Sequence, residues 1–184
     1  MALAWAAGAV SPAFAGDAVR LERETRIRAA MLFHLAQFTY WPEPPADVVR
    51  FCVVGDDTLP EPLAHAVRGR TIAGRRIEVT RAENGEPLDA CEVAYIGHTR
   101  EREIREFFSH WDYPPVLLVG EAERFTELGG MVNLVIGPGR VAFEVNLVHL
   151  HRAGLELRSQ LLRFVRLVVP PPEQPRLPPG RKGP

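Results

Sequence analysis

Short apolar runs alternate with helical segments along most of the chain, and this alternation constrains the fold more than any other feature. Three of the runs have the sequences VRFCVVGDD, CEVAYIG and PPVLLVGE. Continuous apolar runs of this length are typical of strands that are buried on both faces of a sheet. The segments LPEPLAHAV and TREREIREFFSHW lie between the runs and have helical periodicity. The pattern predicts an α/β fold with a mixed, mainly parallel sheet and helices on both faces.

The second half of the chain adds a hairpin and two helices to this prediction. The segment MVNLVIGPGRVAFEVN contains two strand-like runs around Gly137-Pro138-Gly139, a spacing that predicts an antiparallel hairpin near one edge of the sheet. The segment LVHLHRAG is predicted to be helical, with Gly154 as its stop. Ser159 is a candidate N-cap for a last helix over residues 160–168.

The clearest single helix covers residues 20–39. Its apolar side chains recur at helical spacing, and Pro42 disfavours helical geometry at Trp41, so we expect the helix to end near Thr39. The expected apolar stripe consists of Ile27, Ala30, Met31, His34, Leu35 and Phe38. On the polar side, we expect two ion pairs with i,i+4 spacing, Glu22 with Arg26 and Glu24 with Arg28.

The two ends of the chain differ in composition from the part between them. Residues 1–15 are apolar and end in Ala13-Phe14-Ala15, which predicts a cleaved secretory signal, with an Ala-rich leader as the alternative. Residues 170–184 include seven prolines and have no apolar periodicity. We therefore predict one domain over residues 16–169 and an extended or disordered tail after it.

Composition and cysteine count restrict the partners. The formal net charge is −1, so a nucleic acid polymer is not expected as a partner. Cys52 and Cys91 are the only cysteines. If the chain is exported, we expect them to form a disulfide, which would stabilise the fold by about 4 kcal/mol. Two buried free thiols are the alternative for a chain that stays in the cytoplasm.

The sequence contains none of the common catalytic or phosphate-binding motifs, and we expect no enzymatic activity and no cofactor. His149 and His151 would share a face only on a strand, and no Cys, His or Asp cluster near them supplies further metal ligands. We therefore predict no metal site, and His34 on the apolar stripe is interpreted as a core histidine.

The remaining candidates are recognition residues. Tyr40 and Trp41 are large amphipathic side chains at a helix end, and such residues are enriched in binding hot spots. A place in the core is the alternative that we favour for Trp41. Arg158 precedes the predicted last helix, where the helix N-terminus and the guanidinium would both attract an anion; an exposed surface arginine is the alternative.

Several of these segments occur in an order that resembles the YfiR family of periplasmic proteins. The similarity spans about residues 28–167 and includes the aromatic-Trp-Pro close of the first helix, the pair Gly129-Gly130, the Phe143-x-x-Asn146 step and the Ser159-x-Leu-Leu ending. The matching pieces are RAAMLFHLAQFTYWP, FCVVGDD, LAHAVRGRTIAGRRIEV, CEVAYIG, PPVLLVGEAERFTELGGMVNLVI, VAFEVNL and AGLELRSQLLRF.

The resemblance implies an exported, non-catalytic α/β domain that represses an inner-membrane diguanylate cyclase by binding its periplasmic domain. Repression keeps cyclic-di-GMP and biofilm formation low, and release under reducing or envelope stress activates the cyclase. Cys52 and Cys91 fall where a family disulfide would lie. Some members have a second cysteine pair toward the C-terminus, and this chain does not. Members of this kind form dimers in some cases, so a homodimer stays open.

These expectations lead to two functional hypotheses. In the first, the chain is a regulator whose partner is the cyclase, and Tyr40, Glu156 and Arg158 line a shared contact region. In the second, the chain is a periplasmic binding protein for an anionic metabolite or a nucleotide, which in an α/β sheet would commonly bind at the carboxyl ends of the strands.

Overall fold

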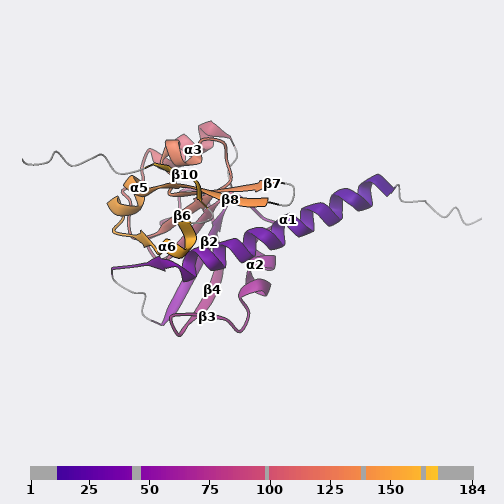
Figure 1. Ribbon diagram of the computed structural model, residues 1–184, viewed down its shortest axis with the longest axis horizontal. Coiled ribbons are helices and arrows are strands. Elements are labelled where there is room, and N and C mark those ends of the chain that lie inside the picture. Colours follow the sequence, from indigo (N-terminus) through magenta and orange to yellow (C-terminus); the bar gives the residue numbers. More distant parts are fainter. Residues whose placement is uncertain (1–11, 43–46, 98–99, 138–139, 163–164, 170–184) are drawn as a thin grey trace, which may run out of the picture.

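The chain folds as a mixed α/β structure, described here by a computed structural model for residues 12–42, 47–97, 100–137, 140–162 and 165–169 (Figure 1). In chain order the elements are α1 Pro12–Gln37, β1 Thr39–Tyr40, β2 Val48–Val54, α2 Pro60–Val67, β3 Thr71–Ile72, β4 Arg75–Ala82, β5 Val93–Ile96, α3 Glu101–Phe108, β6 Leu117–Gly120, α4 Phe125–Leu128, β7 Val132–Gly137, β8 Arg140–Asn146, α5 Leu147–Arg152, β9 Glu156–Leu157, α6 Ser159–Leu162 and β10 Val165–Val169.

The main sheet has eight strands in the order β10-β8-β7-β6-β5-β2-β4-β3. Strands β4, β2, β5, β6 and β7 are parallel to one another, whereas β7 and β8 form the predicted antiparallel hairpin near one edge. In this order the connection from β2 to β4 runs toward the β3 edge of the sheet, whereas the connection from β5 to β6 runs toward the β10 edge. Because such crossovers are right-handed, α2 and α3 cover opposite faces. The predicted fold class is confirmed.

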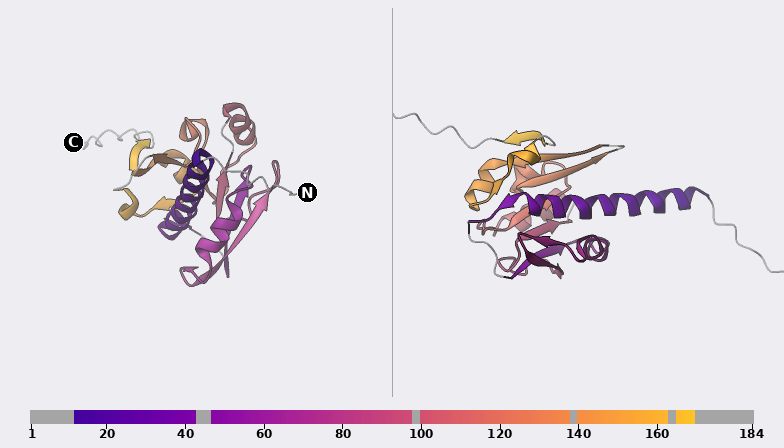
Figure 2. Two further views of the ribbon diagram at one scale, coloured as in Figure 1. Left: turned by 90° about the vertical axis from the view of Figure 1, so that its right-hand side faces the viewer. Right: turned by 60° about the horizontal axis from the view of Figure 1, so that its bottom comes forward.

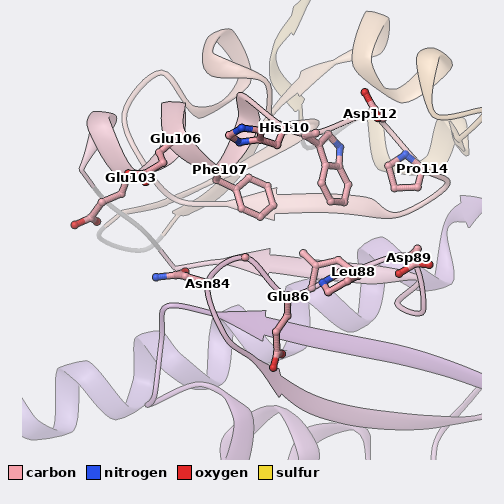
Figure 3. A pocket seen from close by; sticks show the side chains of 13 residues that line it. Asn84, Glu86, Leu88, Asp89, Glu103, Glu106, Phe107, His110, Asp112 and Pro114 are labelled. Atoms are coloured by element: carbon pink, nitrogen blue, oxygen red, sulfur yellow. The ribbon is translucent and has the colours of Figure 1, made fainter.

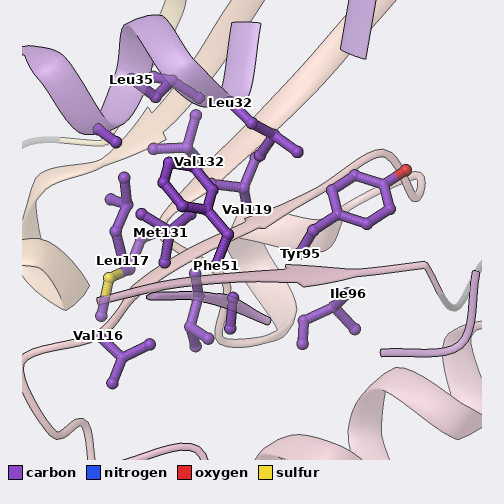
Figure 4. Packing of buried hydrophobic residues seen from close by; sticks show 14 of the residues in the cluster. Leu32, Leu35, Phe51, Tyr95, Ile96, Val116, Leu117, Val119, Met131 and Val132 are labelled. Atoms are coloured by element: carbon purple, nitrogen blue, oxygen red, sulfur yellow. The ribbon is translucent and has the colours of Figure 1, made fainter. Parts of the chain in front are cut away.

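Helix α1 lies across one face of the sheet beside α2, and α3 packs with α4. Leu32 and Leu35 point from α1 toward Phe51, Val119 and Val132, all of which are buried (Figure 4). The first turns of α1 extend beyond the sheet (Figure 2). This packing places the end of α1, and therefore β1, at a fixed position beside the sheet.

The buried side of α1 is rotated relative to the predicted stripe. Ala29, Leu32, Phe33 and Ala36 are buried together with Leu35, whereas the predicted stripe residues Ile27, Ala30, Met31, His34 and Phe38 are only partly buried. Periodicity alone did not place the stripe correctly. One side of the predicted stripe faces the sheet, whereas Met31, His34 and Phe38 on its other side border an open groove.

The predicted last helix over residues 160–168 is wrong. Helix α6 begins at Ser159 and ends at Leu162, and β10 then pairs in parallel with β8, with an irregular register between Val165 and Leu167. Valine-rich sequence favours a strand, and an edge strand was available for it to pair with. The sheet therefore has one more strand on the hairpin side than the sequence predicts.

The two glycines after α4 allow aromatic side chains to pack against the backbone. A Cβ atom on Gly130 would lie 2.1 Å from Phe125 Cε1, and one on Gly129 would lie 2.5 Å from Phe108 Cγ. Asn146 joins the same region, because its Nδ2 donates to Thr126 O and its Oδ1 accepts from two N–H groups that begin α5. The glycine pair and Asn146 are thus packing and capping residues.

We expect Gly130→Ala to lower the free energy of unfolding by about 1–3 kcal/mol, because the new methyl group overlaps the ring of Phe125. Urea denaturation measures the change. Gly137→Ala is the matched control, since no atom lies within 4 Å of its added Cβ, and we expect a change within about 0.5 kcal/mol. Equal losses in the two variants would show that the packing against Phe125 is not the cause.

The predicted disulfide is present between Cys52 and Cys91, with a Cα–Cα distance of 6.0 Å. Cys52 lies on β2, and Cys91 lies at the end of the connection between β4 and β5. Both side chains are buried. The bridge therefore fastens this connection to the middle of the sheet.

We expect Cys52→Ala/Cys91→Ala to lower the free energy of unfolding of the oxidised protein by about 4 kcal/mol, because the closed loop spans 39 positions. Thermal melts with and without reductant measure it. Reduced wild type should melt at a temperature close to that of the variant, and adding reductant should leave the variant unchanged. If the melting temperatures of all forms coincide, the bridge does not stabilise the fold.

The predicted signal and tail fall mostly outside the described residues. Residues 1–11 and 170–184 are not described, and the predicted cleavage after Ala15 lies within the first turn of α1. Within the described ranges, none of the helices combines the length and the hydropathy that crossing a bilayer requires. The boundaries 1–15, 16–169 and 170–184 stay predictions.

Candidate functional site

A small second sheet at the end of α1 brings the predicted recognition residues together. Strands β1 and β9 pair in antiparallel orientation, with Tyr40 opposite Glu156 and Thr39 opposite Leu157. The ladder continues beyond the strands, because Arg158 N–H donates to Phe38 O at 2.9 Å. The sequence did not predict this pairing, since two-residue strands are too short to show alternation.

The side chains on these strands alternate between core and solvent. Trp41 is 8 % exposed, whereas Tyr40 is 53 % exposed. On the other strand, Glu156 and Arg158 are also exposed. Directly opposed residues of an antiparallel pair lie on the same face of the sheet, as do residues two apart on one strand. Tyr40, Glu156 and Arg158 therefore share one outward face, which we call the β1–β9 face.

Trp41 lies in the hydrophobic core, which is the alternative that the sequence favours for it. Its Nε1 atom is buried and finds no acceptor among the described residues. The helix N-terminus contributes little to the anion site predicted for Arg158, because α6 has only four residues and a single helical turn has a small dipole. What remains of that prediction is an exposed arginine on the same face as the exposed side chain of Tyr40.

An apolar groove of about 480 Å³ begins beside the β1–β9 face. Phe38 connects the two features, because its carbonyl accepts the Arg158 N–H and its side chain lines the groove. The lining residues come from α1, β8 and the start of α6: Met31, His34, Gln37, Phe38, Val141, Phe143, Gln160 and Leu161. His34 is thus a groove residue rather than the core histidine that the sequence predicts. The polar side chain of His34 within the apolar stripe was the sequence feature that could have indicated the groove.

Arg28 forms an ion pair that fixes α1 to the sheet, in place of the predicted pair with Glu24. Its Nε lies 2.6 Å from Glu121 Oε1, and the two side chains are 14 % and 18 % exposed. Glu24 instead pairs with Arg20, whereas the predicted pair of Glu22 with Arg26 is present. The pairing with Glu121 joins residues far apart in the sequence, so helical spacing had no means of predicting it.

The electrostatics of this pair are dominated by burial. Burial raises the pKa of Glu121 above its usual value, and the hydrogen bond from Arg28 opposes that rise. Burial also raises the pKa of Tyr95, whose side chain hydrogen-bonds Glu121. Because the folded pKa of Glu121 is raised, this group contributes most to stability at acidic pH and less as the pH rises through that pKa. Burial therefore disfavours the charged form of Glu121, and the hydrogen bond from Arg28 compensates for this only in part.

The usual ligand position of an α/β sheet lies between β2 and β5 in this chain. The strand order changes direction between β2 and β5, and ligands commonly bind at the carboxyl ends of such a strand pair. Here Gly97 N–H donates to Val54 O at 2.7 Å, and a Cβ on Gly97 would lie 2.6 Å from Asp56 Cβ. The residues that directly follow β2 and β5 are therefore in close contact, and one open groove lies beside α1.

The two histidines considered as metal ligands lie on α5 and have different surroundings. His149 Nδ1 is 3.0 Å from Gly130 O, and its ring lies 5.1 Å from that of Tyr113. His151 is exposed. Among the described residues, no group of three or more His, Cys, Asp or Glu side chains has an arrangement that would hold a metal ion.

The fold and the geometry described above define a small α/β protein with an exposed two-stranded face beside an apolar groove. A family model described as YfiR/HmsC-like matches residues 25–166. Because the match covers more than half of the chain, the chain belongs to the YfiR/HmsC-like family. This family is known for periplasmic regulators of diguanylate cyclases and is regulatory rather than catalytic.

Proposed function

We propose that this protein is a non-enzymatic periplasmic regulator that binds and represses an inner-membrane diguanylate cyclase. Export depends on the N-terminal signal, with cleavage after Ala15. The partner is the periplasmic domain of the cyclase, and the consequence is a lower level of cyclic-di-GMP and less biofilm. Family membership over residues 25–166 is the observation that carries this proposal.

The β1–β9 face and the adjoining apolar groove are the contact surface in this proposal. An exposed tyrosine, an exposed arginine and an apolar depression are typical of a binding hot spot. The face is also preorganised, because Trp41 is buried beneath it and the Arg158 N–H is bonded to Phe38 O. Repression requires that the face bind the inactive cyclase more tightly than the active one, since only differential affinity shifts the equilibrium.

We expect Tyr40→Ala/Arg158→Ala to weaken binding to the purified periplasmic domain of the cyclase by at least about tenfold, as for the loss of hot-spot residues. Titration calorimetry measures the dissociation constant. In cells, the same variant should raise cyclic-di-GMP to the level of a deletion strain.

Arg102→Ala is the matched control, because Arg102 is exposed on α3, which belongs to neither strand of the β1–β9 sheet and does not line the adjoining groove. It should bind like wild type. Binding that survives the loss of Tyr40 and Arg158 would remove the β1–β9 face from the interface. An unchanged cyclic-di-GMP level in the deletion strain would refute cyclase repression itself.

The groove supports a second candidate function, the binding of a small ligand. Its apolar lining and volume of about 480 Å³ suit the planar body of a metabolite, and such pockets usually pair an apolar wall with a few polar groups. His34 and Gln37 supply polar groups in the groove, and Arg158 is the nearby cation for an anionic ligand. A nucleotide or another anionic metabolite fits this chemistry.

A panel of nucleoside monophosphates and aromatic carboxylates tests this candidate by thermal shift. A ligand present at a hundred times its dissociation constant should stabilise the protein by about 2.7 kcal/mol. Gln37→Trp should abolish the shift, because the larger side chain fills a groove that Gln37 lines, and Arg102→Ala should leave it unchanged. A panel without any shift would favour a protein partner alone.

A further inference from the structure

A second and larger groove, of about 900 Å³, lies between the β4–β5 connection and α3. Asn84, Glu86, Leu88 and Asp89 line one wall, and the opposite wall runs from Glu103 on α3 to Pro114 (Figure 3). None of its lining residues belongs to the β1–β9 face or to the smaller groove. Its role is therefore independent of the cyclase proposal.

The charged side chains among the described lining residues of this groove are mostly acidic. Among the described residues that line it, there is no lysine or arginine, and His110 is the one basic side chain. Asp89, Glu106 and Asp112 make no side-chain hydrogen bond or ion pair within the described part of the chain. Five carboxylates line it: Glu86, Asp89, Glu103, Glu106 and Asp112. A concave surface lined by one sign of charge concentrates the electrostatic potential and attracts the opposite charge.

An aromatic surface lies between these carboxylates. Phe107 points into the space between the walls (Figure 3). Its ring stacks on that of Trp111, with the centroids 5.4 Å apart. Trp111 Nε1 is buried and has no acceptor in the described ranges. Guanidinium and ammonium groups bind over such rings.

The wall formed by the β4–β5 connection is held firmly. Cys91, at its end, is bridged to Cys52 and donates its N–H to Leu88 O at 2.9 Å. The guanidinium of Arg50 donates to Ala90 O at 2.8 Å. A wall that is fixed before binding lowers the entropy cost of association.

We propose that this groove binds an extended polypeptide segment of a partner protein, one that carries arginine or lysine residues beside an apolar side chain. The cations of this segment pair with the carboxylates of Asp89, Glu106 and Asp112. The rings of Phe107 and Trp111 bind one further cation or the apolar side chain. Acidic walls disfavour nucleic acids and anionic lipid headgroups. The carboxylates are spread along the groove instead of converging on one point, which suits several residues of an extended chain.

The test measures fluorescence anisotropy of a labelled nine-residue peptide in which arginines alternate with leucine and proline. The full chain is the titrant, at an ionic strength of about 0.15 M. We expect binding that weakens as salt is added and that is lost when glutamate replaces every arginine. Failure of the arginine peptide to bind, or equal binding of the glutamate peptide, would overturn the proposal.

Glu106→Arg tests the location. Reversing this charge should weaken binding by about tenfold, the size expected when a partly exposed attraction becomes a repulsion. Glu123→Arg is the matched control, because Glu123 is exposed, carries the same charge and does not line the groove. Equal weakening by both variants would mean non-specific attraction to a negative protein and would overturn the assignment to this groove. Thermal melts of both variants verify that they are folded.

A further variant distinguishes other occupants. The chain's own residues 170–184 contain Arg176, Arg181 and Lys182 and many prolines, so they share the proposed chemistry. If Arg181→Glu/Lys182→Glu makes the peptide bind tenfold more tightly, the chain's own tail occupies the groove and the partner assignment is wrong. Unchanged peptide affinity in this variant supports a separate partner. A dimer that dissociates in Glu106→Arg would instead identify a second copy as the occupant.

Discussion

The seating of α1 on the sheet is the constraint on which the rest of the structure depends. Apolar burial of Leu32 and Leu35 supplies the attraction, and the ion pair of Arg28 with Glu121 sets the position along the sheet. Burial is non-directional, whereas a hydrogen-bonded ion pair fixes geometry. Burial raises the pKa of Glu121 and so disfavours its charged form. Replacing a buried ion pair by apolar side chains is often neutral for stability, so we attribute this pair to positioning rather than to stability.

Everything proposed for the β1–β9 face follows from that position. Helix α1 ends at Gln37, and the next residues become a strand only because β9 lies alongside to pair with them. Burial of Trp41 then orients Tyr40 outward, since neighbouring strand residues point to opposite faces. The apolar groove begins where the same helix leaves the sheet surface, at Phe38. One helix end thus generates both the exposed polar face and the apolar depression beside it.

The sequence was sufficient to predict those elements that are marked by a pattern within their own residues. Buried parallel strands such as β2 and β5 are continuous apolar runs, and the hairpin of β7 and β8 is marked by its glycines, so the fold class was predictable. The strand β10 was not, because the periodicity of a run as short as Val165–Val169 does not distinguish a strand from the end of a helix, and its strand propensity decides only once the edge of β8 is available for pairing. Tyr40, Glu156 and Arg158 were suggested as one group, but their common face depends on a two-residue strand pair without periodicity. The partner of Arg28 is 93 positions away and left no signal at helical spacing.

The disulfide and helix α1 both restrain the strand β2. Cys52 lies on β2, which stands between β4 and β5 in the sheet order, and the bridge fastens the β4–β5 connection through Cys91. Leu32 and Leu35 of α1 point toward Phe51, the residue before Cys52 on the same strand (Figure 4). Reduction removes a restraint from the connection that carries Leu88 and Asp89, which line the larger groove. We therefore expect a redox signal in this chain to act on that groove through the connection and on the β1–β9 face through the stability of the sheet on which α1 packs.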